Sequence, residues 1–358
     1  MPLLARTVAT PLAIEVRPGA VAALAPLLKA GHISSGGKVA IVIGPGHGQR
    51  IAEQLAASLP TASVTTVSGG TLDAALELIS ELRNDFHDAV VGIGGGRTVD
   101  VAKYAASMSG LPFVSVATTL THDGLASPVA TLESHGRKAS FGVHVPIAVF
   151  VDINEVRTAP PEHIRSGAGD VLSNLSAISD WELARRVRDE SVDGLSVSLA
   201  RTAGEAILDL APGTDRYLTT LAESLILSGL AMTFAGSSRP CSGACHEISH
   251  ALDAYHGSPG LHGAQVAFGA RFATWLRGER QLLAALDHAL VVNQLPRRPE
   301  DLGIDRDIFV QAVVEAPRTR PDRFTILEHL DPSPARVEEL VDDYLTTFDT
   351  PVDATQPR

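Results

Sequence analysis

Short apolar runs that alternate with helix-forming segments dominate the first half of this chain. Each run is rich in Val, Ile and Ala, and each is followed by glycine or by small polar residues. Continuous apolar runs of this kind are typical of strands buried on both faces, as in a parallel sheet covered by helices. The sequence therefore predicts an α/β fold with parallel strands at 38–44, 88–94, 112–117 and 147–152, separated by helices near 48–58, 71–84 and 98–109.

The pattern changes near residue 160, where Pro160 and Pro161 stand together. Adjacent prolines mark a boundary, and beyond them the chain reads as successive helices with few β-branched runs. A chain of 358 residues also exceeds the size at which a single core usually stops growing. We therefore expect a parallel-sheet domain over residues 1–158, an all-helical domain over residues 159–358 with a frayed tail after Pro351, and a ligand site in the cleft between them.

Composition excludes several classes of function. The formal net charge is -12, which repels nucleic-acid backbones, so we expect no nucleic-acid partner. The first sixteen residues lack the organisation of a signal peptide, and no run reaches the roughly 18 apolar residues of a membrane span. The only cysteines, Cys241 and Cys245, suit a reducing compartment and are expected to be small buried residues rather than catalytic ones. A soluble cytoplasmic protein without a membrane partner is predicted.

The segment CSGACHEISHALD, residues 241–253, carries residues suited to a metal site. His246 and His250 are spaced to share one helix face, and His262 follows on the next segment. Asp170 is predicted on the first turn of another apolar helix, where a carboxylate read alone is an ordinary helix-start residue. Asp170, His246 and His262 together would supply a carboxylate and two imidazoles and leave a position open for a substrate oxygen, as catalytic zinc sites do.

A glycine-rich segment follows the second predicted strand and opens a helix. Its sequence is GGGRTVDVAK, from Gly94 to Lys103. Glycines let the backbone approach a pyrophosphate, and a helix N-terminus offers oriented N–H groups. Three glycines could alone form a tight turn, but the local context favours nucleotide binding. The polar loop from Thr118 to Pro128 follows the third strand, and its hydroxyls could meet the nicotinamide ribose or amide.

Together these segments resemble those of a known protein family. The chain resembles the sn-glycerol-1-phosphate dehydrogenase family, within the dehydroquinate synthase-like and iron-containing alcohol dehydrogenase superfamily. The resemblance runs nearly end to end and rests on GGGRTVDVAKYAA, PFVSVATTLTHDGLASPVA, GAGDVLSNLSAISDWELA, RPCSGACHEISHALD and HGAQVAFG, in the family's order. It implies a Rossmann-like NAD(P)-binding domain and a helical metal- and substrate-binding domain, with the active site in the cleft.

The resemblance also implies roles for individual residues. The metal ligands would be Asp170, His246 and His262. The substrate-binding and catalytic residues would be Asp123, Asp170 and His250. The cofactor, NAD or NADP, would contact Gly94, Gly95, Gly96, Arg97, Thr98, Asp100, Thr118, Thr119, Thr121 and Ser127. The metal would be Zn²⁺, with Fe²⁺, Ni²⁺ and Mn²⁺ open, and a homo-oligomer is expected.

The chain departs from the family pattern at three places. Cys245 and Ala264 stand where the family has glutamates next to metal ligands, and Arg97 replaces the lysine of GGGK. Such neighbouring carboxylates orient metal ligands, so their loss bears on substrate and reaction more than on fold.

Three functional classes follow. The first is a metal-dependent NAD(P)H oxidoreductase that interconverts a ketone and a secondary alcohol on a small phosphorylated polyol, with dihydroxyacetone phosphate and sn-glycerol 1-phosphate as the expected pair. A divergent form of it would reduce another ketose or polyol phosphate. The second is a sugar-phosphate cyclase of the dehydroquinate synthase kind, a lyase in outcome, which usually has Glu at the position of Asp170. The third is a catalytically silent binding homologue, against which the retained metal triad argues.

Overall fold

The computed structural model describes residues 9–349; the tail after Pro351 lies outside these residues. The first half forms a six-stranded parallel sheet with strand order β1-β8-β5-β4-β2-β3. Four strands match the predicted ones. The strands are β1 (Ala13–Arg17), β2 (Val39–Ile43), β3 (Ser63–Thr66), β4 (Ala89–Gly94), β5 (Phe113–Ala117) and β8 (Ala148–Asp152).

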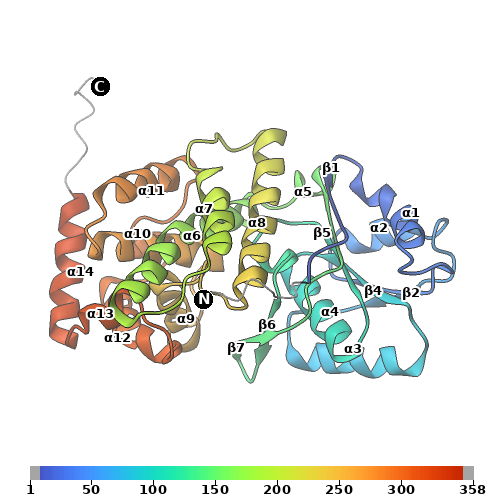
Figure 1. Cartoon of the computed structure of the whole chain (residues 1–358), viewed down its shortest axis with the longest axis horizontal. Coiled ribbons are helices and arrows are strands. Elements are labelled where there is room, and N and C mark those ends of the chain that lie inside the picture. Colours follow the sequence, from blue (N-terminus) through green and yellow to red (C-terminus); the bar gives the residue numbers. More distant parts are fainter. Residues whose placement is uncertain (1–8, 350–358) are drawn as a thin grey trace.

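Helices cover both faces of this sheet, which explains the continuous apolar strands (Figure 1). Along β2, Ile41 and Ile43 point to one face, where they pack with α1 and α2, while Ala40 and Val42 point to the other face, where they pack with α3 and α4. The helical elements of this half are η1 (Ala20–Ala23), α1 (Leu24–Ala30), α2 (Gly48–Leu55), α3 (Leu72–Asn84), α4 (Gly96–Met108) and η2 (Asp123–Leu125).

Three features of the first half were not predicted. The edge strands β1 and β3 are partly exposed, so they lack the apolar signal of the central strands. An antiparallel hairpin of β6 (Val129–Ser134) and β7 (Arg137–Gly142) forms a second sheet. Its turn uses His135 and Gly136, both with positive φ, which suits a tight hairpin.

Every described element after β8 is helical, so the predicted combination of an α/β half and an all-α half is confirmed (Figure 1). The longest of these helices, α6, packs extensively against α7, α8 and α10. The elements are α5 (Ile153–Val156), α6 (Pro161–Arg188), α7 (Gly194–Glu205), α8 (Asp215–Ala235), α9 (Ala244–Tyr255), α10 (His262–Leu276), α11 (Arg280–Val292), η3 (Pro299–Leu302), α12 (Arg306–Thr319), α13 (Ile326–Leu330) and α14 (Pro334–Asp349).

Helix α8 has the length and apolar composition of a membrane-spanning helix, and it is the only one among residues 9–349 that does. More than half of its most apolar stretch is buried inside the protein, and Leu221, Ala222 and Leu225 on it pack in the largest hydrophobic cluster. Core helices of this kind pass the same test of length and hydropathy, so α8 is weak evidence for a membrane span.

Candidate active site

A large cavity collects most of the predicted site residues from both halves of the chain. Its volume is about 1490 Å³, and its walls come from the loops after the sheet strands and from α6, α9, α10 and the loop after α12. Of the residues predicted from the sequence, all but Gly94 line this cavity: Gly95, Gly96, Arg97, Thr98, Asp100, Thr118, Thr119, Thr121, Asp123, Ser127, Asp170, His246, His250 and His262.

The glycine segment lies at the carboxyl end of β4, where α4 begins with Gly96. A Cβ on Gly96 would lie 2.2 Å from His122 Nε2, and one on Gly95 would lie 3.0 Å from Thr119 Oγ1. Gly94 lies behind this wall, where a Cβ would meet Thr98 Cβ at 2.7 Å. All three glycines therefore allow close packing of a neighbouring side chain, and Gly95 and Gly96 also line the cavity.

A buried ion pair fastens α4 to the polar loop. The ammonium group of Lys103 is fully buried, lies 3.2 Å from Asp100 Oδ1, and donates hydrogen bonds to the carbonyl oxygens of Gly124 (2.5 Å) and Ser127 (3.3 Å). Asp100 Oδ2 also accepts from the backbone N–H of Thr131. The pair thus holds in place the loop that carries Asp123 and Ser127.

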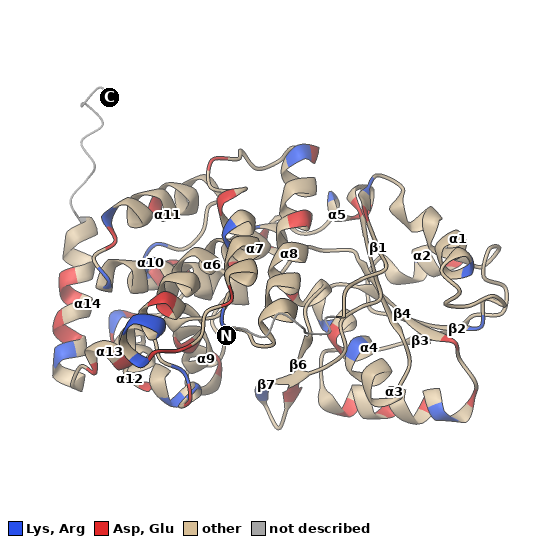
Figure 2. Cartoon of the chain, viewed as in Figure 1, with Lys and Arg blue, Asp and Glu red and all other residues tan. Residues whose placement is uncertain are grey.

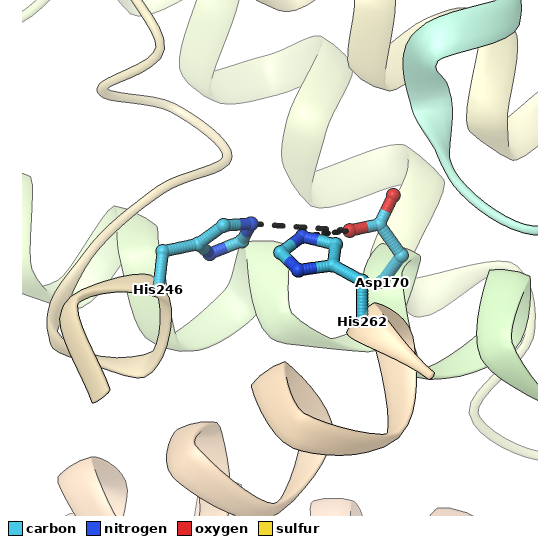
Figure 3. A group of neighbouring side chains, drawn as sticks. All are labelled: Asp170, His246 and His262. Carbon is cyan, nitrogen blue, oxygen red and sulfur yellow. Dashed lines mark ion pairs between the residues drawn. The ribbon is translucent and has the colours of Figure 1, made fainter. Parts of the chain in front are cut away.

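Asp170, His246 and His262 converge on one point of the cavity (Figure 3). Asp170 Oδ1 lies 3.9 Å from His246 Nε2 and 3.8 Å from His262 Nε2, and all three ligand atoms lie within 4.8 Å of one another. These separations are too long for hydrogen bonds but suit three ligands that each bind one cation at about 2.0–2.2 Å. The donor set therefore fits a divalent metal.

The position of Asp170 corrects one expectation. Helix α6 begins at Pro161, so Asp170 lies in its interior and not on a first turn. The small residues before it resemble a helix start but serve close packing: a Cβ on Gly167 would lie 2.2 Å from the Leu120 carbonyl oxygen, and one on Gly169 would lie 2.1 Å from that of Gly263. This close approach brings Asp170 beside the first residue of α10, His262.

Electrostatics keep the imidazoles in the form that binds metals. Burial lowers the pKa of His246 well below its ordinary value, and the neighbouring charges of His262 and His250 lower it further. Burial likewise lowers the pKa of His262, although Asp170 opposes the shift. Neutral imidazoles carry the lone pair that a cation needs.

Asp123 and His250 stand next to this cluster. The backbone N–H of Asp123 donates to Asp170 Oδ2 at 2.9 Å, which orients the carboxylate. Burial, with the negative charge of Asp170, raises the pKa of the Asp123 carboxyl well above its usual value. Burial and the charge of Arg320 lower the pKa of His250 to about 3, and its ring centroid lies 6.3 Å from that of His246.

A chain of hydrogen bonds fixes the tautomer of His262. Gln265 Nε2 donates to Asp253 Oδ1 (3.2 Å) and to the Pro259 carbonyl oxygen (2.9 Å), which turns Gln265 Oε1 toward Ser249. Ser249 Oγ donates its single proton to that oxygen at 2.6 Å, so it can only accept from His262 Nδ1, 3.1 Å away. The His262 Nε2 lone pair therefore faces Asp170, and the chain orients this ligand although Ala264 replaces a glutamate.

His246 has a weaker neighbour. Its Nδ1 lies 3.4 Å from Cys245 Sγ. Burial raises the pKa of the Cys245 thiol to about 12, so the sulfur stays protonated and is a weak hydrogen-bond partner. Cys241 and Cys245 are both buried, as the sequence predicted, and both are free cysteines.

Ser249→Ala is expected to weaken metal binding by about 10- to 100-fold, because His262 would lose the acceptor that fixes its tautomer. Chelator competition on the metal-free protein measures this affinity directly. Ser198→Ala is the matched control, because the Ser198 hydroxyl bonds only to the Gly194 carbonyl oxygen of its own helix. Equal metal affinity in the Ser249→Ala and Ser198→Ala variants would show that the hydrogen-bond chain does not orient the ligand.

Several residues of this site were not predicted from the sequence. Ser249 and Gln265 each follow a predicted ligand at the i+3 spacing that places two residues on one helix face, so this spacing was an available signal. Lys138, on β7, reaches across the cavity to Asp253 at 3.0 Å, and no sequence signal connects these two. Arg320, after α12, also has no local motif.

The fold of this chain is similar to that of known dehydrogenases. A family model described as iron-containing alcohol dehydrogenase matches residues 15–160. A probable glycerol dehydrogenase from Sinorhizobium meliloti is similar over 96% of this chain and 100% of its own, with a TM-score of 0.78 and 21% identity. An iron-containing alcohol dehydrogenase from Thermococcus thioreducens gives a TM-score of 0.74 at 16% identity over 95% of this chain and 99% of its own. The fold is that of the iron-containing alcohol dehydrogenases.

Relatives with higher sequence identity identify the family within this fold. A glycerol-1-phosphate dehydrogenase, NAD(P)+, from Thermococcus kodakarensis is 33% identical over 81% of this chain and 85% of its own length. One from Thermofilum pendens is 43% identical over 67% of this chain and 70% of its own. This chain belongs to the glycerol-1-phosphate dehydrogenase family.

Proposed function

We propose that this chain is a metal-dependent NAD(P)H oxidoreductase that interconverts dihydroxyacetone phosphate and sn-glycerol 1-phosphate. The observation that carries the proposal is the convergence of Asp170, His246 and His262 in the cavity that the glycine loop also lines. A metal site and a cofactor loop on one cavity suit hydride transfer to a polarised carbonyl group. The relatives' name supplies the polyol phosphate and the cofactor.

Asp170, His246 and His262 would hold the metal, with zinc as the expected ion and iron, nickel and manganese as alternatives. When bound, a divalent cation polarises a ketone oxygen as a Lewis acid, and the reduced nicotinamide supplies the hydride. The chain's own contribution is orientation: Ser249 fixes His262, and the Asp123 backbone fixes Asp170.

The cofactor, NAD or NADP, would lie along the carboxyl edge of the sheet. Gly95 and Gly96 line the cavity at the N-terminus of α4, and that end of the helix favours the negative charge of a pyrophosphate. Thr119 Oγ1 is buried without a hydrogen-bond partner among the described residues, and Thr119 lines the cavity. Its hydroxyl could therefore contact the cofactor, together with Arg97, Thr98, Thr118, Thr121 and Ser127.

Two residues would handle the substrate hydroxyl and its proton. His250 lies one helical turn after His246 and lines the cavity, so its imidazole could orient the substrate or pass a proton. The Asp123 carboxyl lies beside Asp170 and also lines the cavity. We assign Asp123, Asp170 and His250 to substrate binding and catalysis.

We also propose roles for the two domains, the partners and the localisation. Residues 1–158 would bind the cofactor and residues 159–358 the metal and substrate, with the division just before α6 (Pro161–Arg188). Lys and Arg are interspersed with Asp and Glu along both halves of the chain (Figure 2), and we expect neither nucleic acid nor membrane as a partner. A cytoplasmic homo-oligomer is proposed.

The test is oxidation of NADH and NADPH by zinc-loaded protein, followed by absorbance. Dihydroxyacetone phosphate, dihydroxyacetone and longer ketose phosphates are compared in parallel. Rapid turnover of dihydroxyacetone phosphate supports the proposal. Activity confined to another ketose phosphate would move the assignment to a divergent reductase.

A further inference from the structure

The Arg320 side chain faces the cavity from the helical half without a partner of its own. Arg320 directly follows α12, is partly buried, and lines the same cavity as His246 and His250. Among residues 9–349, no hydrogen bond or ion pair involves its guanidinium group. A partly buried, unpaired guanidinium group is costly, and its five N–H donors need acceptors.

The charges of Glu247 and Asp322 act on Arg320, but neither carboxyl group forms a hydrogen bond or ion pair with it among the described residues. Arg239 is paired with Glu190, and Arg323 donates to the Ser242 carbonyl oxygen and to Ser238 Oγ. Burial raises the pKa of the Glu247 carboxyl group to about 9, and this group lies 3.0 Å from Thr325 Oγ1. Of the Lys and Arg residues that line the cavity, Arg320 is the one from the helical half.

A second, independent feature lies on the same wall. Ser242 is 5% exposed, lines the cavity, and its Oγ has no hydrogen-bond partner among the described residues. Arg323, in the same segment as Arg320, binds the backbone of Ser242 and so fixes this serine beside the arginine segment. A buried hydroxyl without a partner can donate to an anion that enters the cavity.

The other basic side chains that line the cavity, Arg97 and Lys138, have different neighbours. Arg97 stands at the start of α4 beside the glycine loop, on the cofactor side. Lys138 is engaged by the Asp253 carboxylate. Arg320 instead lines the cavity from the helical half, which also supplies His246 and His250. Its position is thus on the substrate side.

We propose that Arg320 and Ser242 bind the phosphate group of the substrate, an assignment that rests on the proposed function. A guanidinium group matches two phosphate oxygens with parallel N–H donors, and the serine hydroxyl can donate to a third. The phosphate would neutralise the Arg320 guanidinium group while the other end of the substrate reaches Asp170 and His250. The subsite thereby selects phosphorylated ketones over neutral ones.

The experiment compares Arg320→Ala, Arg320→Lys and Ser242→Ala in zinc-loaded protein. We expect Arg320→Ala to lower kcat/KM for dihydroxyacetone phosphate by about 100-fold, mostly through KM, and to change that for dihydroxyacetone by no more than about threefold. Arg320→Lys should recover part of the loss, because a point charge replaces the bidentate fork. Arg318→Ala is the matched control, since Arg318 is exposed and paired with Glu315.

Binding of inorganic phosphate, measured by calorimetry, gives a readout independent of turnover. The wild-type protein should bind phosphate, and Arg320→Ala should lose that binding while keeping the melting temperature of the Arg318→Ala control. Equal losses toward dihydroxyacetone and its phosphate, or unchanged phosphate binding in Arg320→Ala, would overturn the assignment. If the wild type does not reduce dihydroxyacetone phosphate, the proposed function fails, and the phosphate titration alone still decides the subsite.

Discussion

Protein carrying His262→Ala is expected to lose bound metal and to turn over at least about 1000-fold more slowly, because a Lewis acid contributes several kcal/mol to the stabilisation of transition-state charge. His262 begins α10 and its side chain is 29% exposed toward the cavity, so its removal should leave the fold intact. Metal content after dialysis against zinc, NAD(P)H oxidation and the melting temperature are measured on the same preparation.

Cys245→Ala provides the control for this variant. The Cys245 thiol neighbours His246 but stays protonated, so its loss should leave metal content largely unchanged. Full metal content and full rate in His262→Ala would show that Asp170, His246 and His262 do not form the metal site.

Lys103→Met is expected to destabilise the protein by about 3–5 kcal/mol, because it leaves the buried Asp100 carboxylate without its partner. The same change removes the donors that hold the carbonyl oxygens of Gly124 and Ser127, so the polar loop should loosen and cofactor affinity should fall. Urea unfolding measures the stability, and fluorescence titration with NADH measures the affinity.

Lys29→Met is the matched control, because Lys29 is exposed at the end of α1 and should cost little. Adding Asp100→Asn to Lys103→Met should recover part of the lost stability, since no unpaired charge would then be buried. A stability for Lys103→Met equal to that of the control would contradict the structural role of the ion pair.

The sequence was sufficient for the parts of the fold in which local pattern and burial agree. The central strands β2, β4, β5 and β8 are buried along their whole length, and their apolar runs are correspondingly clear. The edge strands and the β6–β7 hairpin are partly exposed, and there the apolar signal weakens. Asp170 was placed correctly in a helix but at the wrong turn, because glycines needed for close packing against Leu120 and Gly263 resemble a helix start.

The residues of the candidate site could likewise be predicted from the sequence only in part. The histidines lie on one segment and the glycine loop on another, so spacing and resemblance could identify both. The contacts between Lys138 and Asp253, and the place of Arg320 on the cavity wall, depend on chain segments that meet only in the folded protein. No pattern of spacing within one segment predicts them.

The most direct test of the central claim is the stereochemistry of the product. Metal-loaded protein is incubated with dihydroxyacetone phosphate and NADH or NADPH, and the glycerol phosphate formed is offered to an sn-glycerol-3-phosphate dehydrogenase with NAD. The account predicts metal-dependent formation of a product that this enzyme does not oxidise, as expected of sn-glycerol 1-phosphate. Oxidation of the product, or no product from fully metal-loaded protein, would contradict it.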